Sequence, residues 1–192
     1  MNLEIPPLKR LLLLLFVVVP IAAWVIVKPM RVVFPTLQGM ICVSETVCVE
    51  DPGTAASAIV LYDEALEWVS QGSTTVRGRP RLVFCSTDAC ANQFGLKDRA
   101  ALTVGKFGTI IGPRAWEAYL VRHEMIHFVQ CERLGVLKVI RMPSWFVEGM
   151  AYSWSKDPRN PLPEPFEAYR SEFNEWSEGV DGPILWRKAR RL

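Results

Sequence analysis

The sequence predicts an α+β domain in which a small mixed sheet packs on a helical half, preceded by one N-terminal transmembrane helix. Three short segments have the β-branched and aromatic composition of strands and are bounded by turn-forming residues: 81–85, 102–104 and 109–111. Apolar residues recur at helical spacing in three longer segments: 55–72, 113–134 and 144–154. The order along the chain is therefore a helix, a small sheet and then a helical half.

The first half of the domain is predicted to hold one long helix and the sheet. Asp51 is placed to cap the helix and Pro52 to occupy its first turn, and the helical period continues to Gly72. A buried strand follows, and Asp88 can cap a short helix that ends near Gly95. The next two strand segments are separated by glycine-containing turns, which indicates a hairpin.

The strongest helical signal of the chain begins at Pro113. Apolar residues occupy most sides of this segment as far as Leu134, and Gly135 provides a C-terminal stop. A helix that is apolar on most sides is buried in a soluble domain, so we expect this one at the centre of the helical half.

The C-terminal part is predicted to contain two further helices joined by a loop. One helix begins at Pro143, with Ser144 as its N-cap, and ends near Trp154. The segment 157–165 contains four prolines, which excludes a continuous helix there. A last amphipathic helix is expected over about 166–176. From their position, the loop and this helix are expected to form one wall of the functional site or to cover it.

The length and composition exclude several classes of protein. A chain of 192 residues that is 50% apolar is sufficient for one packed domain and far too apolar for a disordered chain. The net charge of +2 and the scattered basic residues give no reason to expect nucleic acid as a partner. The one basic cluster, 187–191, is typical of a solvated chain end, with contact to anionic lipid as the alternative.

The N-terminal region contains an unbroken apolar run over 11–27, between the basic pairs Lys9/Arg10 and Lys28/Arg31. As a helix this run covers about 25 Å, the short end of what spans a bilayer. The alternative is a cleavable signal peptide, whose cleavage region would be 20–23. The run continues past that region, which favours an uncut anchor.

The chain is accordingly divided into three parts. Residues 1–10 form an N-terminal flank, 11–28 the anchor or signal peptide, and 29–192 the globular domain. Basic residues flank the apolar run equally on both sides, so they do not determine the orientation of the domain relative to the membrane.

Four of the five cysteines form two local pairs. Cys42 and Cys48 bracket a short hairpin or tight loop, and Cys85 and Cys90 lie at the end of a strand and in the turn after it. Two disulfides are expected, and hence an extracytoplasmic domain, either periplasmic or extracellular. The alternatives are reduced, buried cysteines and, less favoured by the spacing, a zinc ribbon. Cys131 is expected in the core as a small hydrophobic residue.

The chain contains two histidines, and both lie in the sequence His123-Glu124-Met125-Ile126-His127. On a helix, positions i and i+4 stand about 6 Å apart on one face, so both imidazoles can reach one ion. Zinc binds imidazole nitrogen and prefers four ligands, one of which is water in a catalytic site. Glu124 is placed to act as a general base on that water. The alternative is a hydrogen-bonded network without metal.

The third protein ligand is expected from the next helix. Glu148 lies early on it, and Gly149 lets that helix press close to a neighbour. Two histidines and a glutamate form a common catalytic zinc site. The alternative is an exposed glutamate whose charge suits the helix dipole. The adjacent histidine pair favours the ligand role.

The motifs H-E-M-I-H and W-F-V-E-G-M-A resemble those of the gluzincin metallopeptidases, over about 110–155. The resemblance implies a zincin-like fold with one zinc ion per chain, held by His123, His127 and Glu148, and Glu124 as the catalytic base. Twenty residues separate His127 from Glu148. This spacing is unlike that of the large aminopeptidases, whose additional domains are also missing. The chain is similar instead to compact, single-domain gluzincins.

The resemblance also implies a hydrogen-bond donor for the carbonyl oxygen of the substrate and a sheet edge for the peptide. Tyr152, Tyr169 and Arg170 are the candidate donors. Tyr152 has the alternatives of orienting a ligand or packing only its ring. The strand 109–111 is the candidate edge on which an extended peptide pairs.

These observations together predict a membrane-tethered zinc peptidase that hydrolyses peptide or protein substrates. The oligomeric state is left open. An alternative from another class is a non-catalytic module that keeps the fold for binding or assembly at the membrane. A third alternative is that the motif is accidental.

Overall fold

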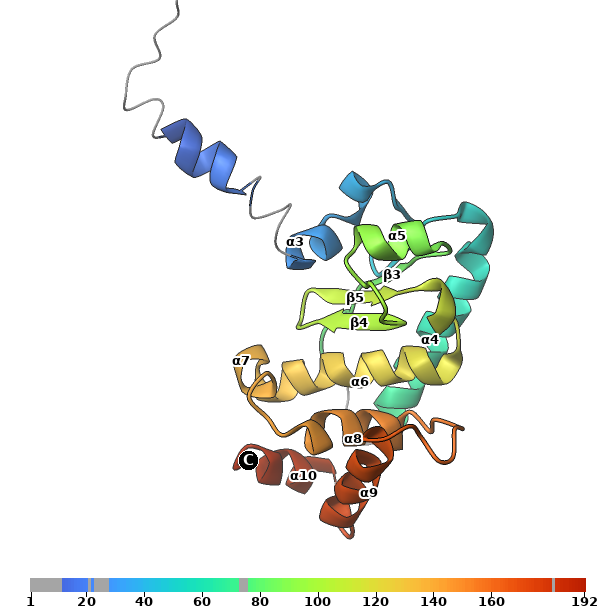
Figure 1. The fold of residues 1–192 in the computed structure, drawn as a ribbon, viewed down its shortest axis with the longest axis vertical. Coiled ribbons are helices and arrows are strands. Elements are labelled where there is room, and N and C mark those ends of the chain that lie inside the picture. Colours follow the sequence, from blue (N-terminus) through green and yellow to red (C-terminus); the bar gives the residue numbers. More distant parts are fainter. Residues whose placement is uncertain (1–11, 21, 23–27, 73–75, 181) are drawn as a thin grey trace, which may run out of the picture.

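Figure 1 shows the computed structural model, which describes residues 12–20, 22, 28–72, 76–180 and 182–192. A five-stranded sheet lies in one half of the domain, and the C-terminal helices lie in the other, with one long helix between them. The predicted α+β class and mixed sheet are confirmed.

The sheet has three parallel strands at its centre and an antiparallel strand at each edge. Its strands follow the order β1-β2-β3-β5-β4, where β2, β3 and β5 are parallel. All residues of these three strands are buried, as expected of a sheet covered on both faces. The strand bounds are β1 Ile41–Cys42, β2 Val47–Val49, β3 Leu82–Phe84, β4 Ala101–Val104 and β5 Gly108–Ile111.

The strand expected at the edge of the sheet is an interior strand, so this prediction is wrong. Thr109, Ile110 and Ile111 belong to β5, which pairs with β3 on one side and with β4 on the other. The edge strand is β4, whose residues are half-buried. The predicted hairpin of these two strands is confirmed. The crossover that brings β5 beside β3 is a long-range pairing and leaves no local sequence signal.

The helices begin and end close to the predicted positions, with three differences at their starts. The cap of α5 is Thr87, not Asp88, since the Thr87 side chain accepts from the Cys90 amide. Pro113 begins a short 3-10 turn, and α6 starts only at Ala118. Ser144 is the first residue of α8, and its side chain makes no cap hydrogen bond. The bounds are α3 Lys28–Val33, α4 Ala55–Gly72, α5 Asp88–Gln93, α6 Ala118–Leu134, α7 Val136–Val139, α8 Ser144–Trp154, α9 Phe166–Ser177 and α10 Gly182–Ala189.

Helix α6 connects the two halves of the domain. It contacts β4 and β5 on one side and α8 on the other, with α4 also packed against it (Figure 1). Val121 and Met125 of α6 share one core with Phe146 of α8 and Phe173 of α9. The predicted burial of this helix is therefore confirmed.

The packing of α8 on α9 depends on Gly149. A Cβ atom at this position would lie 2.2 Å from the backbone oxygen of Tyr169 and 2.7 Å from Cβ of Phe173. Only glycine allows so close an approach between two helix backbones. The expectation that Gly149 lets its helix press on a neighbour is confirmed, and the neighbour is α9.

Both expected disulfides are present. Cys42–Cys48 links β1 to β2, and Cys85–Cys90 links the residue after β3 to α5. Cys131 is a free, buried cysteine, as predicted. Disulfides of this kind indicate an oxidising compartment.

The predicted N-terminal anchor lies partly outside the described residues, which omit 11, 21 and 23–27. Within the part of the chain that the structure describes, no helix has both the length and the apolar character needed to cross a membrane.

Candidate metal centre

Three side chains from two helices converge at the contact of α6 with α8. His123 and His127 lie one turn apart on α6, with their Nε2 atoms 3.0 Å from each other. Glu148 reaches them from α8, and its two carboxylate oxygens lie 3.5 Å from Nε2 of His123 and 3.8 Å from Nε2 of His127. The structure thus brings together the histidine pair that the spacing predicted and the glutamate that was expected as the third ligand.

These donors fit a tetrahedrally coordinated ion. Bonds of about 2.0–2.1 Å from a tetrahedral zinc ion place neighbouring ligand atoms about 3.3–3.4 Å apart. The three observed separations bracket that value, and all donor atoms of the group lie within 4.8 Å of one another. His123 is buried, while His127 and Glu148 are half-buried, so the group is partly accessible to solvent. The group could therefore bind one metal ion.

Gln130 fixes the orientation and tautomer of His127. It is fully buried, its Nε2 donates to the Val147 carbonyl at 2.9 Å, and its Oε1 lies 2.9 Å from Nδ1 of His127. Because the amide nitrogen faces a carbonyl, the amide oxygen must accept, so His127 carries a proton on Nδ1. The Nε2 atom of His127 is then the ring atom that faces the other two donors. This bridge also ties α6 to the residue before Glu148.

The ring of His123 is oriented by packing, with no hydrogen bond at its Nδ1 atom among the described residues. The Tyr152 ring lies edge-on against its imidazole, with ring centroids 4.5 Å apart. The Nδ1 atom of His123 is buried and has no hydrogen-bond partner among the described residues. The two histidines are therefore held by different means, one by an amide and one by an aromatic ring.

Electrostatics keep Glu148 ionised and Tyr152 protonated. Burial opposes ionisation of Glu148, but the hydrogen bond to His123 and the charges of both histidines and Arg99 hold its pKa below the ordinary value. Burial, together with the nearby Glu148 charge, raises the pKa of Tyr152 to about 12. At neutral pH the site thus contains an ionised ligand beside a phenol that can donate a hydrogen bond.

Glu124 lies on the sheet side of α6 and contacts the edge strand. The hydroxyl of Thr103, on β4, is 2.7 Å from the carboxylate oxygen Oε2 of Glu124 and 2.9 Å from the hydroxyl of Thr109. Thr103 can donate to Glu124 while it accepts from Thr109, which is fully buried. This hydroxyl pair holds the Glu124 carboxylate beside the strand edge.

The loop after α8 returns to the tyrosine side of the site. Asp157 has a fully buried side chain that pairs with Arg159, and the Arg159 guanidinium lies 5.6 Å from the Tyr119 ring centroid and 5.9 Å from that of Tyr152. The loop expected over 157–165 is confirmed, and its first turn lies against Tyr152. The segment therefore forms a wall beside His123.

The other two candidate donors have different surroundings. Tyr169, on α9, is half-buried beside Phe166, and its backbone oxygen faces Gly149. Arg170 pairs with Glu167 and donates to the Arg159 carbonyl at 3.1 Å. Arg170 thus holds the loop against α9. Among the three candidates, Tyr152 has a contact to a residue of the triad.

Sequence reasoning missed Gln130 and Thr103. Gln130 follows His127 by three residues, which is one helical turn, so its position on the same face was available from the sequence. Thr103 was recognised only as a strand residue, because its contact with Glu124 depends on the pairing of β4 at the sheet edge.

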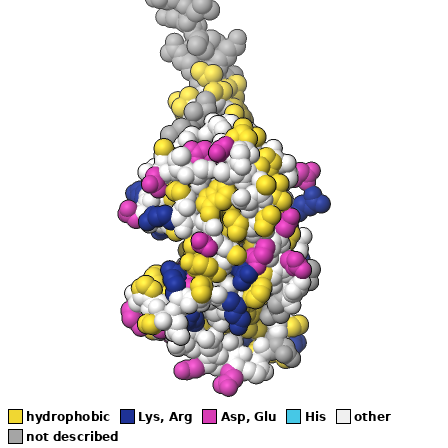
Figure 2. Space-filling view, turned by 90° about the vertical axis from the view of Figure 1, so that its right-hand side faces the viewer, with side chains coloured by type: hydrophobic (Ala, Val, Ile, Leu, Met, Phe, Trp, Pro, Cys, Tyr) yellow, Lys and Arg dark blue, Asp and Glu magenta, His cyan; other side chains and the backbone are white. Residues whose placement is uncertain are grey.

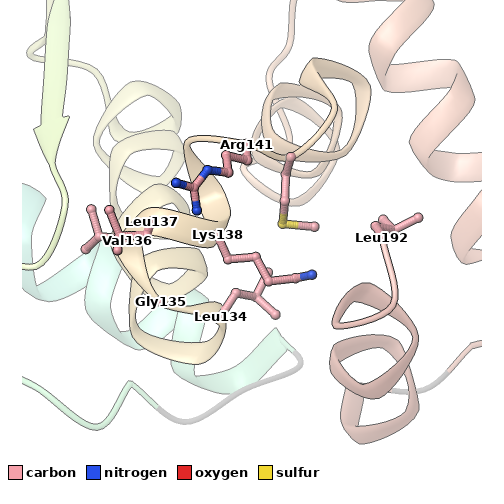
Figure 3. Close-up of a pocket in the computed structure, with 8 residues that line it drawn as sticks. Leu134, Gly135, Val136, Leu137, Lys138, Arg141 and Leu192 are labelled. Atoms are coloured by element: carbon pink, nitrogen blue, oxygen red, sulfur yellow. The ribbon is translucent and has the colours of Figure 1, made fainter.

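The surface has a hollow between the two halves of the domain. Figure 2 shows a notch in the left edge of the molecule, between the upper part, which contains the sheet, and the lower part, which contains the C-terminal helices. Figures 1 and 2 share their vertical axis, so heights in the two views correspond. In Figure 1, α6 lies at a height between these two parts. A second, separate groove of about 660 Å³ lies at the C-terminal end of α6 (Figure 3). It begins at Leu134, two turns beyond His127, and includes none of the three candidate ligands.

Comparison of the chain with protein-family models, curated proteins and solved structures finds no match. The assignment of this site rests on its geometry.

Gln130 provides the first prediction. Replacing it with leucine leaves the Nδ1–H of His127 and the Val147 carbonyl without partners, so affinity for zinc is expected to fall about 10–100-fold. Competition with a chromophoric chelator measures this affinity directly. The matched control is Gln71→Leu on α4, where the glutamine is exposed and, among the described residues, bonds to Glu67. Equal affinities of the two variants would rule out the proposed role of Gln130.

Proposed function

We propose that this protein is a zinc-dependent peptidase of the gluzincin type, with the metal held by His123, His127 and Glu148. The observation that carries the proposal is the agreement of the three donor separations with tetrahedral geometry, together with the buried carboxylate of Glu124 on the helix that carries both histidines. Two imidazoles and one carboxylate suit zinc. The residues fit such an ion. Gln130 orients His127, and the Tyr152 ring packs against His123.

Zinc held by these residues would supply Lewis acidity to a water molecule and to a substrate carbonyl. Glu124 takes a proton from the attacking water and later delivers it to the leaving amine. Thr103 holds the Glu124 carboxylate in place by one hydrogen bond. Tyr152, protonated at neutral pH, is the candidate donor to the negative charge that develops on the carbonyl oxygen.

The substrate is proposed to bind as an extended strand along β4. This strand is the edge of the sheet, so one row of its backbone groups has no partner strand among the described residues. Thr103 of β4 contacts Glu124, which brings this edge beside the catalytic carboxylate. Backbone pairing at an edge gives affinity for a peptide without requiring a particular side chain. The reaction class is therefore hydrolysis of a peptide bond in an extended segment.

The two disulfides support placing the domain in an oxidising compartment. With the apolar run over 11–27, we propose that the protein is tethered to a membrane with its domain on the extracytoplasmic side.

The proposal is tested by metal analysis and a peptidase assay on the full chain. About one zinc ion per chain is expected, with cleavage of a broad peptide library that is lost with a chelator and restored by zinc. Zinc at that stoichiometry without cleavage would favour a non-catalytic binding or assembly module. Absence of a tightly bound metal after zinc loading would contradict the metal site itself.

A further inference from the structure

A basic and apolar face lies at the end of the domain remote from the triad. Three segments form it: 101–110, which includes the β4–β5 turn, 133–142, which includes α7, and the C-terminal segment 182–192. Of the 22 Lys and Arg residues in the chain, eight lie in these segments, which contain none of the 20 Asp and Glu residues. The rest of the chain is therefore net negative, although the whole chain is close to neutral.

Contacts between the three segments show that they adjoin one another. Nζ of Lys138 donates to the Arg190 carbonyl at 3.0 Å, which joins α7 to the C-terminal segment. A Cβ on Gly105 would lie 3.1 Å from Cγ2 of Val136, so the β4–β5 turn packs against α7. Lys138, Arg141 and Leu192 line the same groove (Figure 3). The positive charges thus gather on one side of the molecule.

Large apolar side chains project between these charges. Phe107 at the tip of the turn is 52% exposed, Leu137 69% and Ile140 74%, and Leu192 at the chain end is also exposed. Side chains with this much exposed area contribute little to the hydrophobic core. Exposed apolar groups surrounded by basic residues are typical of surfaces that lie on an anionic membrane, with the apolar groups among the headgroups.

The position of α3 relates this face to the membrane tether proposed above, on which this step of the argument rests. Its first residue, Lys28, follows the apolar run over 11–27 directly in the sequence. A Cβ on Gly108 would lie 2.8 Å from Cγ1 of Val32, so α3 packs beside the β4–β5 turn that carries Phe107. In Figure 1, α3, this turn, α7 and the C-terminus lie along the same side of the domain.

We propose that this face, centred on Phe107, Leu137 and Ile140, docks on the surface of an anionic lipid bilayer. Lys106, Lys138 and Arg141 face the lipid phosphates, and the apolar side chains enter the headgroup layer. The proposal does not depend on a metal or on peptidase activity. Docking would hold the triad, which lies further along α6, at a fixed height above the membrane.

The test uses the full chain in nanodiscs of phosphatidylcholine, with or without phosphatidylglycerol. An environment-sensitive fluorophore is attached at Ile140→Cys or, as control, at Val60→Cys on α4, where the side chain is 66% exposed. In Figure 1, α4 lies on the opposite side from α7. The emission at position 140 is expected to shift to shorter wavelength in anionic discs, with no shift at position 60. The unsubstituted chain, whose free Cys131 is buried, gives the background.

Charge removal tests the lipid assignment. Lys138→Gln and Arg141→Gln are each expected to lower the ratio of docked to undocked protein roughly five-fold in anionic discs. Equal emission at positions 140 and 60 in anionic discs would overturn the proposal. A shift at position 140 that is as large without phosphatidylglycerol would also overturn it. So would a shift that requires DNA or an acidic protein in place of lipid.

Discussion

Replacing Glu124 with glutamine is expected to lower peptide turnover by about 10²- to 10⁴-fold while the zinc content stays at that of the parent protein. The amide keeps the size and the hydrogen bond to Thr103, but it cannot accept a proton from water. The three metal donors belong to other residues, so metal binding has no reason to change. Parallel measurement of zinc stoichiometry and of peptide cleavage checks both halves of this expectation.

The control is Glu117→Gln, at the start of the same helix. Glu117 is exposed, and its side chain makes no cap hydrogen bond to α6, so this variant should cleave at the parental rate. A second comparison is His127→Ala, which removes a ligand and should lose zinc as well as activity. Turnover that survives in Glu124→Gln at the parental rate would exclude Glu124 as the general base.

The second large effect is expected at Gly149, which contacts no substrate in the proposed mechanism. Alanine here would place a methyl group 2.2 Å from the Tyr169 carbonyl oxygen, so α8 and α9 must separate. Overpacking against backbone is expected to lower the free energy of unfolding by about 3 kcal/mol or more. Because Glu148 precedes this glycine, the shift of α8 should also weaken zinc binding. Chemical denaturation and chelator competition measure the two effects.

Gly39→Ala separates steric overlap from the general cost of replacing a glycine. Gly39 has a φ of +84°, and nothing lies within 4 Å of a Cβ placed there. The expected loss of about 1–2 kcal/mol comes from the left-handed backbone alone. If Gly149→Ala cost no more than Gly39→Ala and bound zinc normally, the close approach of α8 to α9 would not position Glu148.

Much of the fold could be predicted from local signals. The helical period identified α4, α6, α8 and α9, and the local cysteine spacing identified both disulfides. Helix α10 was missed, because the basic residues of the tail suggested a solvated end, whereas Leu185 and Trp186 are buried. The edge of the sheet was assigned to the wrong strand, since the order of strands depends on pairing between distant segments.

In the candidate site, too, residues that share one helix could be predicted, whereas contacts between distant segments could not. Its two histidines share one helix, so their separation followed from helical geometry, and Glu148 was found by the chemistry that two histidines require. The contact of Thr103 with Glu124 joins residues 21 apart across two elements, and no spacing rule links them. The placement of Tyr152 against His123 likewise depends on how α8 packs on α6.

With zinc bound at the proposed site, the bridge from His127 through Gln130 to the Val147 carbonyl would couple metal binding to the stability of the whole domain. The ligands come from two helices, and a ligand that binds only the folded state stabilises it by mass action. At a free zinc concentration 100 times the dissociation constant, this gain is about 2.7 kcal/mol, a substantial part of the stability of a small domain. The supply of zinc would then regulate how much folded protein persists, as well as how much of it is active.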